Sequence, residues 1–255
     1  MEDGAISNNK DYLAIFGFGY AKFQHISYGI NQNLTIFVPK KDKIKINILN
    51  LKNELPKKRK IKIIYYLKPV LGEDEIKSNG FLNLEFKENF NTILCKNMIN
   101  SDFNRIMYVS CNEKINSYTG NKKYFFGRGT INNPDGLKYM NLNFENSLGK
   151  DSCIAIQIEV ELEAFESKNI ILLLGEEQRA IDCFDMVYKY TNLNKCLEEL
   201  NNVKKYWEDL LSKIQVETPI ESVNIMLNGW CMYQTICSRM LARTAFYQCG
   251  GAYRI

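Results

Sequence analysis

The chain has 255 residues, of which 45% are hydrophobic and 24% charged, a balance that fits one large globular domain or one domain and part of a second. Its 33 lysines and arginines against 29 acidic residues give a net charge of only +4, which argues against a nucleic-acid partner. The densest basic run, residues 57–60, leads directly into an apolar strand. We interpret it as a solvated turn, with a nucleic-acid patch as the alternative.

The sequence carries no sign of export, of a membrane span or of a metal site. Its amino terminus lacks a basic segment followed by an apolar one, and no run of 18 apolar residues occurs. We therefore expect a cytoplasmic protein without a membrane partner. The eight cysteines include no CxxC pair and His25 is the only histidine, so we expect reduced, mostly buried thiols and no zinc.

From Tyr12 to about Leu174, apolar residues recur at every second position, which is the period of a β-strand with one buried face. The clearest run is 154–165, where isoleucine, valine and leucine alternate with glutamine and glutamate. Further runs of this kind lie at 34–38, 44–48, 61–65 and 106–110. Turns are expected at Asn79-Gly80, Thr119-Gly120 and Pro134-Asp135-Gly136. Many such strands, each with one polar face, predict an antiparallel β-sandwich.

After Gly175 the apolar period lengthens to that of helices, first over Glu177 to about Tyr190 and then over Leu193 to Ile214. The second helix has an amphipathic stripe. This stripe consists of Leu197, Leu200, Val203, Trp207 and Leu211. We interpret this second helix as a linker.

A third helix is predicted to begin at Thr218, with Pro219 in its first position and Glu221 completing a capping box. Extending to about Phe246, it would be roughly 42 Å long. It is apolar on most of its circumference, which is typical of a helix packed on more than one side. One face carries Met226, Trp230, Tyr233, Cys237 and Met240, and the other carries Ile225, Met232 and Ile236.

The residues alone show no phosphate loop, Ser/His/Asp set or metal cluster. However, Asn228–Thr235 (NGWCMYQT), the arginines Arg239 and Arg243, and Phe246–Ala252 (FYQCGGA) closely resemble the signature that opens the helical barrel of glycoside hydrolase family 94. Weaker landmarks resemble the family's sandwich domain in order along the chain. They are 17–20 with Phe23 and His25, 34–38, 70–72, 126–128 and 173–176. The form of the barrel signature looks nearer to the β-1,2-glucan branch than to the cellobiose or chitobiose branch.

The resemblance implies an α+β protein with a supersandwich-like β-sandwich (1–175), a helical linker (176–215) and the start of a truncated (α/α)6 catalytic barrel (216–255). It implies an inverting, glycosyltransferase-type glycoside phosphorylase or a cyclic β-1,2-glucan synthase that acts on a β-glucan or oligosaccharide. Inorganic phosphate would be the co-substrate, with no cofactor or metal, and an acid in the barrel would protonate the departing oxygen. A homodimer of the complete enzyme is also implied.

In the family, Gly-Gly-Ala leads to Gly-Phe-Arg-Asp, and the general-acid Asp follows much later. Here Ala252-Tyr253 leads straight to Arg254-Ile255, so we assign no catalytic residue and do not carry the sugar-binding arginine over to Arg254. By the same resemblance, Met1 is expected to lie inside the sandwich domain, after the family's first strands. We therefore expect an N-terminal fragment that is inactive alone, with a non-catalytic carbohydrate-binding or interaction module as the alternative.

Candidate substrate-binding residues are Tyr247, Gln248, Gly250 and Gly251, for which a glycine helix cap is the competing interpretation. We interpret Trp230 and Tyr233 as core residues, with sugar stacking as the alternative. Arg239 and Arg243 are interpreted as helix-surface ion-pair partners, with support of a sugar-binding loop as the alternative. His25 is interpreted as a structural strand-end residue rather than a base.

Overall fold

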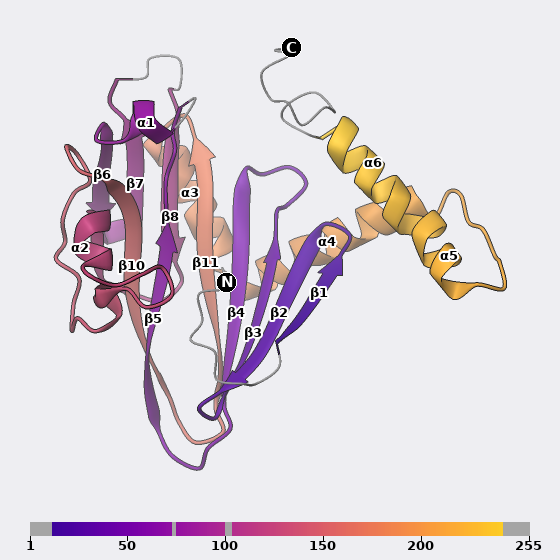
Figure 1. The fold of residues 1–255 in the computed structure, drawn as a ribbon, viewed down its shortest axis with the longest axis horizontal. Coiled ribbons are helices and arrows are strands. Elements are labelled where there is room, and N and C mark those ends of the chain that lie inside the picture. Colours follow the sequence, from indigo (N-terminus) through magenta and orange to yellow (C-terminus); the bar gives the residue numbers. More distant parts are fainter. Residues whose placement is uncertain (1–11, 73–74, 100–103, 242–255) are drawn as a thin grey trace.

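The computed structural model describes residues 12–72, 75–99 and 104–241, which form two antiparallel sheets and a layer of helices (Figure 1). The larger sheet has eight strands in the order β1-β2-β3-β4-β11-β8-β7-β6, and the smaller has three in the order β5-β10-β9. The strands are β1 (Leu13–Gly17), β2 (Tyr20–Ser27), β3 (Ile30–Phe37), β4 (Ile44–Asn53), β5 (Arg59–Leu67), β6 (Leu82–Lys87), β7 (Thr92–Asn97), β8 (Ile106–Cys111), β9 (Ile115–Asn121), β10 (Ser152–Leu162) and β11 (Ser167–Glu177). The longer helices are α3 (Ala180–Tyr190), α4 (Leu193–Leu211) and α6 (Cys231–Arg239). Short turns are α1 (Glu75–Ser78), η1 (Glu88–Phe90), α2 (Lys122–Phe126), η2 (Asp135–Leu137), α5 (Glu221–Ile225) and η3 (Met226–Trp230).

The first core lies between the two sheets, as the alternating pattern predicts. In β10 the predicted apolar side is buried throughout and packs against leucines and isoleucines of the larger sheet. Its members are Ile154, Ile156, Ile158, Val160 and Leu162. The expected antiparallel sandwich is therefore confirmed.

The second core lies on the opposite face of the larger sheet, where α3 and α4 cover it. Strands β4 and β11 consequently bury both faces: Ile46 and Leu173 face the helices, whereas Leu49 and Leu172 face the smaller sheet. The expectation of one polar face per strand is wrong for these two strands, because helices replace water on their outer side.

The basic run 57–60 enters β5 at Arg59 instead of forming a complete turn. Because β5 pairs antiparallel with β10, Lys58 meets Glu161 and Glu163 at 2.9 Å each, and Lys60 meets Glu159 at 2.6 Å. Apart from Glu159, which is 24% exposed, these side chains are largely exposed, so the ion pairs add little stability. The charges are nonetheless paired across strands, which leaves less charge available to an anionic ligand.

The helix and turn bounds differ from the expected ones in several places. Strand β11 continues to Glu177, so the first helix begins at Ala180, and the second helix ends at Leu211. Leu197 is 42% exposed, and Cys196 takes its place in the buried stripe of α4. Thr119-Gly120 lies inside β9 rather than in a turn, and a Cβ at Gly120 would stand 2.5 Å from the Ser147 nitrogen. Its glycine therefore permits a close approach of two backbones.

The other two turns are confirmed, with Gly80 at a φ of 84° and Asp135 opening η2.

Within the described ranges, no helix is long and apolar enough to cross a membrane. Of the cysteines in the described residues, five are buried, whereas Cys237 is half-buried and Cys231 is exposed. The buried ones are Cys95, Cys111, Cys153, Cys183 and Cys196.

Candidate functional site

The four candidate sugar-binding residues Tyr247, Gln248, Gly250 and Gly251 lie outside the described residues, and so does Arg243. Their assignment stays a prediction. The described part of the barrel signature lies in η3 and α6, within a helical segment that begins at α5 and leaves the sheets at the far end from α2 (Figure 1). The site that can be built is therefore the junction between this segment and the sandwich.

The helical segment begins later than the capping-box prediction states. Helix α5 starts at Glu221, and the Thr218 hydroxyl does not cap it. Instead, the Asn224 side-chain amide pairs with the Thr218 backbone in both directions: Oδ1 accepts from its nitrogen at 2.8 Å and Nδ2 donates to its oxygen at 2.9 Å. The Thr218 hydroxyl also donates to Asn224 Oδ1 at 2.7 Å, so its position is already committed to this contact.

Asn228, the first residue of the barrel signature, repeats this contact one turn later. Its Oδ1 accepts from the Val216 nitrogen at 2.6 Å, and its Nδ2 donates to the Val216 oxygen at 2.8 Å. Each asparagine amide thus makes the same pair of backbone hydrogen bonds that a neighbouring β-strand would make. Together they hold the extended chain at 216–218 along the helix. We call these two contacts the asparagine clasp.

The helix is interrupted by the π-helical turn η3 (Met226–Trp230), so the single uninterrupted helix predicted from the sequence is wrong. Gly229, Tyr233 and Cys237 face the sandwich at spacings of four, and Asn224, which contacts the 216–218 chain as Asn228 does, lies five positions before Gly229. A π-turn adds one residue to a helical turn, which accounts for the first step of five.

The π-turn divides the apolar face that we predicted. Tyr233 and Cys237 pack against the second core together with Met232 and Ile236, whereas Met226 is 45% and Trp230 37% exposed. The core interpretation is confirmed for Tyr233. Trp230 lies outside the second core of the described structure, so its interpretation as a core residue of the complete barrel stays a prediction.

Tyr233 is the centre of the junction. Its hydroxyl accepts a hydrogen bond of 3.2 Å from the Gly19 nitrogen, and its ring lies 4.6 Å from Trp207 and 5.1 Å from Phe18. Burial raises the pKa of Tyr233, which keeps the phenol protonated. Gly19 adopts a φ of 79°, and a Cβ there would stand 2.5 Å from the Trp207 indole nitrogen. The turn between β1 and β2 therefore needs glycine both for its backbone and for its contact.

Sequence reasoning identified the landmark 17–20, Trp207 and the Trp230–Tyr233 pair separately, but it did not predict that Gly19, Trp207 and Tyr233 meet. The hydrogen bond from Gly19 to Tyr233 joins residues 214 positions apart, and no local pattern encodes such a pairing. His25 is buried in β2, where it stacks on Tyr12 at 3.8 Å, as a structural interpretation predicts.

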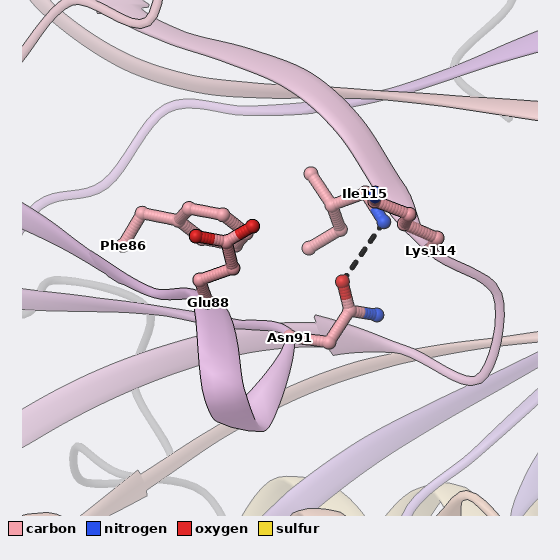
Figure 2. Close-up of a pocket in the computed structure, with 5 residues that line it drawn as sticks. All are labelled: Phe86, Glu88, Asn91, Lys114 and Ile115. Atoms are coloured by element: carbon pink, nitrogen blue, oxygen red, sulfur yellow. Dashed lines mark hydrogen bonds between the residues drawn. The ribbon is translucent and has the colours of Figure 1, made fainter.

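A hollow of about 330 Å³ opens on the sandwich beside η1, lined by Phe86, Glu88, Asn91, Lys114 and Ile115 (Figure 2). Asn91 ties its walls together, because Oδ1 accepts from the Ile115 nitrogen at 2.8 Å and Nδ2 donates to the Cys111 and Glu113 oxygens. With its amide occupied, Asn91 is a structural residue. Only the exposed charges of Glu88 and Lys114 remain for a ligand, and the sequence analysis did not identify this hollow.

Two sequence models match the chain. The glycosyl hydrolase 94 supersandwich domain matches residues 4–193, and the catalytic domain of the glycosyl hydrolase 94 superfamily matches residues 206–255. The chain belongs to the glycosyl hydrolase 94 family. The family resemblance and the sandwich fold that it implies are therefore confirmed, and the junction around Tyr233 joins the two matched regions.

Curated relatives match nearly the whole chain. The cyclic beta-(1,2)-glucan synthase NdvB of Rhizobium meliloti is 26% identical over 98% of this chain and 9% of its own length. The N,N'-diacetylchitobiose phosphorylase of Vibrio furnissii is 24% identical over 94% of this chain and 31% of its own length. The chain thus spans less than a third of each of these relatives.

Solved structures resemble the fold. A putative kojibiose phosphorylase from human microbiome has a TM-score of 0.50 at 14% identity, over 85% of this chain and 26% of that protein. A bacterial glucoamylase complexed with acarbose also has a TM-score of 0.50, at 12% identity, over 79% of this chain and 29% of that protein. At such identities the likeness concerns architecture alone.

Proposed function

We propose that this chain is the supersandwich portion and the beginning of the catalytic domain of an enzyme that cleaves or rearranges β-glucans. The observation that carries the proposal is the junction at Tyr233, where the region that matches the catalytic domain is docked onto the region that matches the supersandwich. The supersandwich would hold the first catalytic-domain helix in place. The substrate would be a β-glucan or oligosaccharide, in keeping with the named activities of the relatives.

The chemistry would be phosphorolysis or transglycosylation with inversion at the sugar carbon. A carboxylic acid protonates the departing glycosidic oxygen, and inorganic phosphate attacks from the opposite face in place of the activated water of a hydrolase. Phosphate is therefore a co-substrate, and the reaction calls for no cofactor or metal. We assign neither the acid nor the phosphate pocket to residues of this chain.

We also propose that the 255-residue chain has no activity by itself, because the reaction needs an acid, a phosphate pocket and a held sugar ring in one place. The abundant carboxylates do not meet this need. Glu159 and Glu161 are paired with lysines on an open strand surface, and Glu198 is paired with Lys195 on α4. None of these three groups lines the hollow beside η1.

The direct test incubates purified chain with β-1,2-glucooligosaccharides and phosphate and assays glucose 1-phosphate. We expect no turnover above that of a boiled control, and turnover would show that an acid within the 255 residues had been overlooked. The second test reads the DNA that follows codon 255. A frame that encodes Phe-Arg-Asp and further helices should, when co-expressed with this chain, restore glucose 1-phosphate formation. An unrelated gene there would favour the non-catalytic module instead.

A further inference from the structure

The π-turn η3 coincides with the place where the sandwich touches the catalytic-domain helix. Phe18, at the tip of the turn between β1 and β2, lies against Gly229, the one buried residue of η3. A Cβ at Gly229 would stand 2.5 Å from Phe18 Cζ, so no side chain fits while the ring is in place. The ring has little freedom to withdraw, since it packs on Tyr233 at 5.1 Å.

The extra residue of the π-turn changes which side chains face the sandwich. An α-helix advances by about 100° per residue, so one inserted residue rotates everything before it by about that angle relative to everything after it. Without the insertion, Ile225 rather than Asn224 would lie in line with Gly229 and Tyr233. The asparagine clasp to Thr218 would then be lost, and an isoleucine that is now 63% exposed would turn inward.

We propose that Phe18 is a positioning residue that sets the rotational register of the catalytic-domain helix through Gly229. The ring occupies the gap at the π-turn, and the Gly19 nitrogen fixes the next turn through the Tyr233 hydroxyl. Both contacts come from the two-residue turn between β1 and β2. A change in this turn would therefore alter the direction in which the side chains of α6 point. The inference rests on the proposed function, because it treats the segment from residue 206 as part of a catalytic domain.

We call this control of the helix register by Phe18 and Gly229 the register lock. Amide hydrogen exchange on the full chain tests it. Gly229→Ala should raise exchange in α6 (Cys231–Arg239) about tenfold or more, because the new methyl group meets the Phe18 ring. Phe18→Ala should also raise it. In the Phe18→Ala background, however, adding Gly229→Ala should change exchange by less than about twofold, since the clash is gone and alanine is the better helix former.

The dependence of the Gly229→Ala effect on Phe18 distinguishes the proposed role of Phe18 from a general need for glycine at position 229. An equal effect of Gly229→Ala with and without Phe18 would overturn the proposal, and so would a parallel rise in β10, because either result means that Phe18 acts on overall stability. Leu227→Ala is the matched control: it lies in the same π-turn, is 46% exposed and should leave α6 within about twofold of the parent.

If the Gly229→Ala variant does not fold, amide exchange in the Tyr233→Phe variant tests the proposal instead. This substitution removes the acceptor of the Gly19 nitrogen, together with the hydroxyl's hydrogen bond to Cys237 inside α6, and should raise α6 exchange about threefold while β10 stays protected. No rise in α6 would contradict the lock. Amide exchange is measured without any enzymatic turnover, so the two proposals can fail separately. A negative exchange result would leave the proposed activity untouched, and a completed enzyme without activity would leave the exchange result unchanged.

Discussion

The two tryptophans of the chain should differ sharply in what they contribute to stability. Trp207 is 6% exposed and packs between Tyr206 and Tyr233, whereas Trp230 is 37% exposed on the outward side of the π-turn. A buried tryptophan removes about 150–250 Å² from water, which corresponds to about 4–6 kcal/mol as an upper bound. We expect Trp207→Ala to lower the free energy of unfolding by about 3–5 kcal/mol. Trp230→Ala should cost about 1–2 kcal/mol, because its outward edge is already in water.

Urea unfolding followed by far-ultraviolet circular dichroism measures both values, since this signal does not depend on the tryptophan that is removed. The transitions should be recorded at two protein concentrations. If Trp230→Ala costs as much as Trp207→Ala at both, the outward face of the helix is buried after all and the rotation imposed by η3 is misassigned. If the cost grows with concentration alone, the outward face is covered by a second copy.

Three further perturbations follow from individual side chains. Asn91→Gly should lower the free energy of unfolding by about 2–3 kcal/mol, because it keeps a residue suited to the φ of 49° but loses three hydrogen bonds; thermal unfolding measures it, and Asn91→Ala should cost about 1 kcal/mol more. Burial tends to raise the pKa of Asp42, but hydrogen bonds from Lys189 and Tyr190 lower it on balance from 3.8. Its stabilisation is therefore present above pH 3.8 and lost as the pH falls through the lowered pKa, so Asp42→Asn should flatten the acid limb of a Tm profile recorded between about pH 2 and pH 6. Iodoacetamide at about pH 8 should label Cys231 before the five buried cysteines, as mass spectrometry would report, because burial raises the pKa of those five thiols to about 12.

The strands could be predicted from the sequence wherever one face is dry and the other wet. The second half of β10 is such a case, because Val160 and Leu162 enter the first core while Glu159 and Glu161 meet lysines on the other side. In its first half the predicted polar side is buried as well, since Cys153, Ala155 and Gln157 are 0% exposed. The same reasoning placed β4 and β11 correctly but missed their second buried face, since a strand covered by helices has no polar side to reveal it. The local sequence pattern predicts that a strand forms, but it does not predict which element packs on each of its faces.

The junction was harder to predict because its determinants act across the chain. Thr218, Pro219 and Glu221 form a sound capping pattern, yet Asn224 competes for the Thr218 backbone and hydroxyl and the helix starts later. The π-turn leaves only a weak local trace, a glycine inside a helical pattern. The residue that its glycine faces is Phe18, more than two hundred positions earlier, and the helix sequence alone does not reveal this contact.

Helix α4 belongs physically to both matched regions. The supersandwich match ends at residue 193 and the catalytic match begins at 206, so the helix, Leu193–Leu211, spans the interval between them. Its first half closes the second core through Cys196 and Leu200, and its second half supplies Trp207 to the junction with Tyr233. A boundary drawn at 193 would remove from the second core the buried side chains of Leu200, Val203 and Trp207. The larger sheet and the catalytic-domain helix are therefore joined both through α4 and at the turn between β1 and β2, where Gly19 bonds to Tyr233 and Phe18 lies against Gly229.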